Sequence, residues 1–83
     1  MVRRDKLEII YTILDVSTDG ANKTKIVYQA NLNFKSVSSY LNVLIMNGLI
    51  DVNETNPGTI YKTTEKGLKL MSDVEEVQSV LKR

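Results

Sequence analysis

One side of a predicted helix in the middle of the chain carries small side chains that donate and accept hydrogen bonds. Taking ~100° per residue, this side holds Lys35, Ser36, Ser39, Asn42, Val43 and Met46. Ser and Asn form helices less readily than Ala, Glu, Lys or Gln, which are expected on a face that only meets water. Asparagine can pair bidentately with adenine, and serine can contact bases or phosphates. The pattern therefore favours a DNA-contacting face over a merely solvated one.

Charge is distributed unevenly along the chain, although its net value is only +1. No acidic residue lies between Asp19 and Asp51, and this stretch holds Lys23, Lys25 and Lys35. A locally positive segment can face phosphates while the rest of the surface does not attract them. The middle of the chain is therefore the part best suited to a polyanionic partner.

The chain contains neither cysteine nor histidine. This excludes disulfide bonds, thiolate zinc sites and acid–base catalysis by histidine. No nucleophile and base can be paired from the other residues, so we expect no enzymatic activity, no metal and no cofactor. No apolar run approaches the ~18 residues of a membrane helix. We expect a soluble, cytoplasmic, nucleoid-associated protein with no membrane contact and no small-molecule ligand.

The elements that must position these residues begin with a predicted helix over residues 3–17. Two apolar stripes at helical spacing run along it: Leu7, Ile10, Tyr11 and Leu14, and Ile9, Ile13 and Val16. A helix that is apolar on more than one side is expected to be covered on more than one side. A chain of 83 residues has a marginal core, to which a partner subunit would add buried area.

Two short helices are predicted next, over residues 24–30 and 35–47. Asn22 or Thr24 can cap the first of them, and Asn33 can cap the second. The inward face of the second is predicted to hold Phe34, Val37, Leu41, Leu44 and Gly48. The glycine stands where helices commonly end in a left-handed conformation.

Residues 49–53 and 59–63 are β-rich and flank an Asn-Pro-Gly turn, which predicts a two-stranded hairpin. A last helix is predicted to begin at Thr63 or Thr64. The fold class is therefore mainly α with a small β-hairpin, in the order helix, helix, helix, hairpin, helix, which is a winged helix-turn-helix. We expect a DNA-binding domain over residues 1–65 and a dimerisation helix over 66–83, both in one compact unit.

The last helix repeats apolar residues in a heptad pattern: Leu70, Val74, Val77 and Leu81. Together with Ile9 and Ile13 of the first helix, this seam forms a surface larger than one small domain can hide. The alternative is that the last helix packs on the first helix of its own chain and completes a monomeric core. We favour a homodimer, because most soluble oligomers are twofold and two half-sites increase affinity.

The stretch LNFKSVSSYLNVLIMNGLI, residues 32–50, resembles the recognition-helix region of winged-helix regulators such as the ArsR and MarR families. Nearly the whole chain is similar to small archaeal winged-helix transcriptional regulators, which are related to archaeal chromatin proteins that dimerise through a C-terminal coiled coil. The resemblance implies double-stranded DNA as partner. The residues it implicates are Lys23, Lys25, Lys35, Ser36, Ser38, Ser39 and Asn42, and Lys62 completes the predicted DNA-binding set.

The hairpin departs from the family pattern, because it holds Glu54 and no basic residue before Lys62. Insertion of an arginine into the minor groove is therefore not available at its tip. This hairpin is the wing of the fold, and its lack of a basic tip fits an alternative function, in which the winged helix binds another protein. A second alternative, an architectural chromatin protein, would need a larger positive charge than +1. A DNA-binding transcriptional regulator remains the leading hypothesis.

Overall fold

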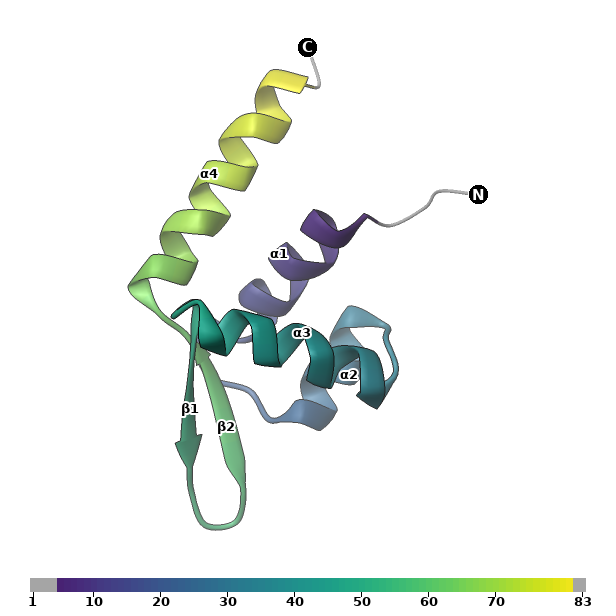
Figure 1. Ribbon diagram of the computed structural model, residues 1–83, viewed down its shortest axis with the longest axis vertical. Helices are drawn as coiled ribbons and strands as arrows, with labels where there is room; N and C mark the ends of the chain where they lie inside the picture. Colours follow the sequence, from purple (N-terminus) through teal and green to yellow (C-terminus); the bar gives the residue numbers. More distant parts are fainter. Residues whose placement is uncertain (1–4, 82–83) are drawn as a thin grey trace.

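The computed structural model describes residues 5–81 and shows four helices and one hairpin (Figure 1). The elements are α1 Lys6–Val16, α2 Lys23–Ala30, α3 Phe34–Met46, β1 Ile50–Glu54, β2 Thr59–Thr63 and α4 Glu65–Leu81. Their order and type are those of a winged helix-turn-helix, so the predicted fold class is confirmed. Within the described residues, predicted and observed helix ends differ by a few residues at most, and positions 3, 4, 82 and 83 of the predicted helices lie outside that range.

The first three helices begin in the same way, with an Asp or Asn side chain that accepts a backbone N–H three residues further on. Asp5 caps α1, Asn22 caps α2 and Asn33 caps α3, over distances of 2.7, 2.8 and 2.7 Å. Each cap satisfies one of the N–H groups that a helix start leaves without a partner. The caps predicted at Asn22 and Asn33 are confirmed, and they fix where α2 and α3 begin.

Two residues with positive φ end the helices of the helix-turn-helix. Asn31 has φ 56° directly after α2, and Gly48 has φ 72° just after α3. Asparagine and glycine adopt this left-handed conformation at the lowest cost, so each can reverse the chain direction. The turn at Asn31 sets α3 across α2, and the turn at Gly48 leads into the hairpin (Figure 1).

The core lies where α1, α2, α3 and the base of the hairpin meet. Its buried apolar residues are Ile13, Leu14, Ala21, Ile26, Ala30, Val37, Leu41, Leu44, Ile50 and Met71. Each helix of the helix-turn-helix contributes at least two of them. Burying a side chain of this size stabilises a fold by about 1.5–3 kcal/mol. The core therefore holds α3 by one face only and leaves its other face outside.

The hairpin pairs β1 with β2 in antiparallel register from Ile50 opposite Thr63 to Glu54 opposite Thr59. The loop before α2 adds a third, one-residue contact: Ala21 and Tyr61 exchange both backbone hydrogen bonds, at 2.9 and 2.8 Å. This bridge ties the base of the wing to the start of α2. The wing tip beyond it projects away from the helices (Figure 1).

The start of α4 packs tightly against the backbone that follows α3. Thr64 Oγ1 accepts the Gly67 N–H at 3.1 Å, and Thr63 Oγ1 donates to the Leu14 carbonyl at 2.6 Å. Gly67 is buried, and a Cβ there would collide with the Leu49 carbonyl oxygen and lie 2.6 Å from Thr63 Cγ2. A glycine is therefore required at this point for α4 to approach the core.

We expect Gly67→Ala to lower the free energy of unfolding by about 1–3 kcal/mol, because overpacking against a carbonyl cannot be relieved by moving a side chain. This is the net loss expected after the ~1 kcal/mol by which alanine normally favours a helix over glycine. Gly58→Ala is the matched control, since a Cβ there meets nothing within 4 Å. Urea denaturation of both variants measures the difference. Equal midpoints for Gly67→Ala and the wild type would contradict the close approach.

Two of the residues predicted on the inward face of α3 are exposed. The Phe34 side chain is 53% exposed, and Gly48, which follows the end of the helix, is exposed as well. Phe34 is the first residue of the helix. A helical projection gives the direction of a side chain, but not whether another element reaches that far along the axis to cover it.

Candidate nucleic-acid interface

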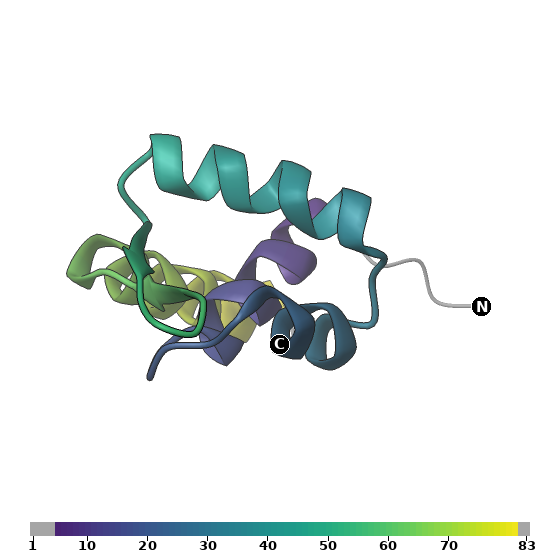
Figure 2. The ribbon, with the colours of Figure 1, turned by 90° about the horizontal axis from the view of Figure 1, so that it is seen from below.

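Helix α3 lies along one side of the molecule (Figure 2). Val37, Leu41 and Leu44 are at most 2% exposed and anchor it to the core. Because these three residues share one face, the opposite face points outward at every turn. That outward face is formed by Lys35, Ser36, Ser39, Asn42, Val43 and Met46. This arrangement has the geometry needed for a helix to be laid into a groove of a partner.

The first two turns of the outward face are polar. Ser39 and Asn42 are exposed, while Ser36 is half-buried beside the cap, where its N–H donates to Asn33 Oδ1. Ser39 Oγ donates to the Lys35 carbonyl at 3.2 Å, which still leaves the hydroxyl oxygen free to accept. Lys35 is exposed in the first turn, where the helix dipole also favours an anion. Short polar groups thus line the surface beside a single cation.

The last turns of the same face are apolar. Val43 is 54% exposed and Met46 is 85% exposed. The sequence predicts that both residues lie on this side, but they were not among the residues predicted to bind DNA. Their apolar character on a side that is otherwise hydrophilic is the signal by which the sequence could have marked them as binding residues.

Helix α2 supports α3 through a polar contact as well as through the core. Lys23 Nζ donates to Ser38 Oγ at 2.8 Å, and both residues are half-buried. Ser38 therefore faces α2, and its contact with DNA stays a prediction. Lys23 is held between the two helices, whereas Lys25 is exposed. The two lysines of α2 are thus placed differently, although the sequence treats them alike.

Two further exposed side chains lie on other elements of the winged helix. Lys62 is exposed on β2, directly across the hairpin from Asp51. Tyr28 on α2 is 79% exposed and was not singled out from the sequence. A tyrosine hydroxyl is a donor that often contacts a phosphate. Arg3 and Arg4, which could supply further phosphate contacts, lie outside the described residues.

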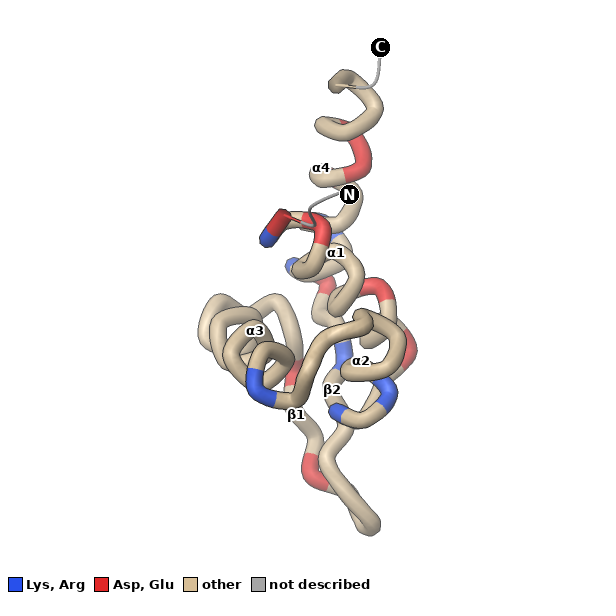
Figure 3. The backbone as a smooth tube through the Cα atoms, turned by 90° about the vertical axis from the view of Figure 1, so that its right-hand side faces the viewer, with Lys and Arg blue, Asp and Glu red and all other residues tan. Residues whose placement is uncertain are grey.

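Acidic residues are confined to part of the described chain (Figure 3). Lysines occur on all four helices and on β2, whereas Asp and Glu are absent from α2 and α3. This distribution follows from the acid-free stretch between Asp19 and Asp51. The surface around α3 is therefore locally positive in a nearly neutral chain.

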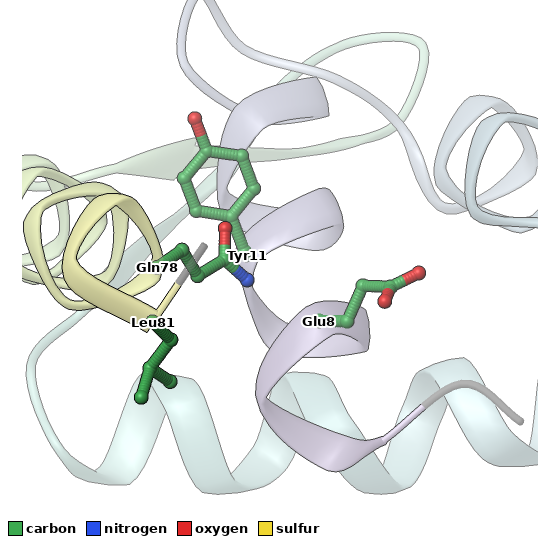
Figure 4. A pocket seen from close by; sticks show the side chains of 4 residues that line it. All are labelled: Glu8, Tyr11, Gln78 and Leu81. Carbon is green, nitrogen blue, oxygen red and sulfur yellow. The ribbon is translucent and has the colours of Figure 1, made fainter. Parts of the chain in front are cut away.

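A groove between the first half of α1 and the end of α4 forms a second surface feature (Figure 4). It is lined by Glu8, Tyr11, Gln78 and Leu81. Tyr11 donates from its hydroxyl to Glu75 Oε2 at 2.5 Å and so fastens α4 to α1. This hydrogen bond, with burial and the Glu75 charge, raises the pKa of Tyr11 to about 12.

The raised pKa of Tyr11 gives a testable pH dependence. Because the folded-state pKa exceeds the ordinary value of 10.0, its contribution to stability is complete below pH 10 and is lost as the pH rises through about 12. We expect Tyr11→Phe to be less stable than the wild type near neutral pH and to show a smaller loss between pH 10 and 12. Thermal unfolding across that range measures it, and parallel curves for the two proteins would contradict the contact.

The residues assigned to a dimer interface divide into three groups. Ile13 is 0% exposed and Val74 is 6% exposed, both packed within their own chain. These two side chains are covered by α1 and α4 of the same chain, and their place in a dimer interface stays a prediction. Ile9 and Leu70 are half-buried against the core. Val77 and Leu81 are 52% and 76% exposed, so the seam is open only toward the end of α4.

The chain belongs to the winged helix-turn-helix family, which matches residues 3–82. It is similar to two uncharacterized proteins of Methanocaldococcus jannaschii. MJ0287 is 35% identical over 80 residues, which cover 95% of this chain and 78% of that protein. MJ0290 is 39% identical over 77 residues, which cover 92% of this chain but only 35% of that protein. The chain thus spans about a third of the length of MJ0290.

Solved structures show the same fold. Sso10a-2, a DNA-binding protein from Sulfolobus solfataricus, is 29% identical with a TM-score of 0.85, over 95% of this chain and 83% of that one. The transcriptional regulator BldR from the same organism is 16% identical with a TM-score of 0.79, over 88% and 55% of the two chains. Sco5413, a MarR family regulator from Streptomyces coelicolor, is 20% identical with a TM-score of 0.70, over 84% and 49%. The predicted resemblance to archaeal and MarR-type winged-helix proteins is confirmed.

The family is winged helix-turn-helix, and the fold is shared with the DNA-binding protein Sso10a-2. Within residues 5–81, the acidic side chains form no group of three that could hold a metal ion. None of the helices in that range combines the length and apolar character needed to cross a bilayer. The surface around α3 is therefore the candidate site that remains.

Proposed function

We propose that this protein is a transcriptional regulator that binds double-stranded DNA and reads the major groove with α3. The observation that carries the proposal is the outward placement of Ser39 and Asn42 on a helix whose leucines are fully anchored. A major groove about 12 Å wide admits an α-helix, provided that its facing side chains are short. Sso10a-2, which shares the fold at 29% identity, is a DNA-binding protein, and this supports the same partner here.

Within this proposal the residues have different roles. Asn42 pairs with a base edge, and Ser36 and Ser39 contact bases or nearby phosphates. Lys35 binds a phosphate at the start of α3, where charge and helix dipole act together. Lys25 and Lys62 contact the backbone from α2 and from the wing, and Lys23 acts mainly by holding α3 in position through Ser38.

We also propose that the protein acts as a homodimer through the free end of α4. The apolar residues offered there are Val77, Val80 and Leu81, all more than half exposed. The groove beside Tyr11 continues this surface onto α1, and it has the dimensions to receive a side chain from a second copy. Two copies would place two α3 helices in successive major grooves ~34 Å apart. Residues 66–83 then form the dimerisation helix, and the protein associates with the nucleoid in the cytoplasm.

Fluorescence anisotropy with a labelled generic duplex at low salt tests DNA binding. We expect saturable binding that weakens steeply between about 50 and 200 mM salt, because lysines release condensed counterions when they contact phosphates. The wing without a tip cation and the net charge of +1 favour a second candidate, a protein-interaction module. Absence of binding even at low salt would support that candidate and refute the proposal.

A further inference from the structure

The outward face of α3 changes from polar to apolar along its length. Lys35, Ser36 and Ser39 occupy the first half, and Val43 and Met46 occupy the second. Asn42 lies between the two halves. The two apolar side chains are 54% and 85% exposed, on a helix whose core contacts are already supplied by other residues. Their exposure is therefore not explained by packing within the chain.

The face also lacks the groups that read guanine. Guanine is most often recognised by an Arg or Lys that bonds its O6 and N7 together. Arginine occurs only at positions 3, 4 and 83 of the sequence, so α3 has none. Its single cation, Lys35, stands in the first turn, where a helix end meets phosphates. The middle and the end of α3 thus offer no donor pair suited to a G·C base pair.

The same face suits A·T base pairs. Adenine presents N6 and N7 to an asparagine amide, and thymine presents a methyl group that makes apolar contacts. Asn42 supplies the amide, and Val43 and Met46, neighbours on the same face, supply apolar surface beside it. The surroundings hold lysines and no acidic residue between Asp19 and Asp51, which complements a polyanion better than an apolar protein partner.

We propose that α3 selects A·T-rich DNA by placing Val43 and Met46 against thymine methyl groups while Asn42 pairs with adenine. This inference rests on the proposed function and adds the class of sequence that the site prefers. Burying one methyl group is worth roughly a fourfold gain in affinity, so several contacts in one complex give a measurable preference.

Duplexes that differ only in the methyl group test the inference. Two alternating duplexes of about two helical turns each are compared by anisotropy, one of adenine and thymine and one of adenine and deoxyuridine. Uracil lacks only the C5 methyl of thymine, so phosphates and hydrogen-bonding groups are the same. We expect the uracil duplex to bind at least roughly fourfold more weakly, the effect of one lost methyl contact. An alternating guanine–cytosine duplex of equal length reports the sequence-independent binding.

Variants then assign the preference to α3. Val43→Thr combined with Met46→Gln keeps side-chain size and removes apolar surface at two exposed positions, so the fold is retained. We expect this double variant to bind the thymine and uracil duplexes equally. Leu68→Gln removes apolar surface at a 43% exposed leucine near the start of α4, outside both proposed interfaces, and should keep the wild-type preference.

The outcomes separate the inference from the proposed function. Binding of all three duplexes with equal affinity overturns the methyl contact and leaves DNA binding intact. A thymine preference that survives in the double variant also overturns it, because the methyl groups are then read elsewhere. Binding to none of the duplexes overturns both, and points to a protein as the partner of this face.

Discussion

Asn42→Glu is expected to weaken duplex binding by roughly fivefold to 150-fold, the range that corresponds to losing one bidentate base contact worth about 1–3 kcal/mol. The new carboxylate adds repulsion from the phosphates that flank the groove. Asn42 is exposed and outside the core, so the variant should fold normally. The measurement is the dissociation constant from anisotropy at fixed salt.

Ser72→Glu is the matched control for Asn42→Glu. It introduces the same charge at an exposed position of α4, on the side of that helix away from Val74 and the core. Both variants lower the net charge by one, so a general loss of attraction to DNA would affect them equally. Similar affinities for the two variants would contradict the assignment of α3.

The second large effect is expected from Val77→Asp combined with Leu81→Asp. Charges at these two positions should separate the subunits, because each would be buried in the interface without a partner. A single subunit then loses the second half-site, and duplex affinity should fall on the order of a hundredfold or more. Analytical ultracentrifugation gives the mass of the free protein, and anisotropy gives the affinity.

The control for the dimer variant is Ser72→Asp combined with Ser79→Asp. Both serines are exposed on α4, on the side away from Val77 and Leu81. This control carries the same charges on the same helix and should remain dimeric. If the wild-type protein itself sediments as a monomer at all accessible concentrations, the α4 interface does not exist. Loss of dimer with unchanged affinity would show that one α3 suffices.

Local signals explain why the helix-turn-helix could be predicted from the sequence. Asn22 and Asn33 stand one turn before apolar periodicity begins, and an Asx cap needs only its own neighbours. Gly48 ends α3 for an equally local reason, since its positive φ requires no distant contact. The outward direction of Asn42 follows from the spacing of Val37, Leu41 and Leu44.

Features that depend on which element covers which side chain were not predictable in this way. The heptad pattern of α4 is continuous, yet Val74 is covered by its own chain while Leu81 is open. Periodicity shows that a stripe must be buried and does not show by what. The contact between Lys23 and Ser38 depends on how α2 crosses α3, and a helical projection treats the two helices separately.

Nuclear magnetic resonance tests most directly the claim that the outward face of α3 contacts DNA. Amide chemical shifts of the nitrogen-labelled protein are followed while an A·T-rich duplex is added to saturation. We expect the largest changes at Lys35, Ser39 and Asn42, with Ser72 on the far side of α4 unchanged. If the protein is saturated with the duplex and the chemical shifts of these three α3 amides do not change, the proposed function is contradicted.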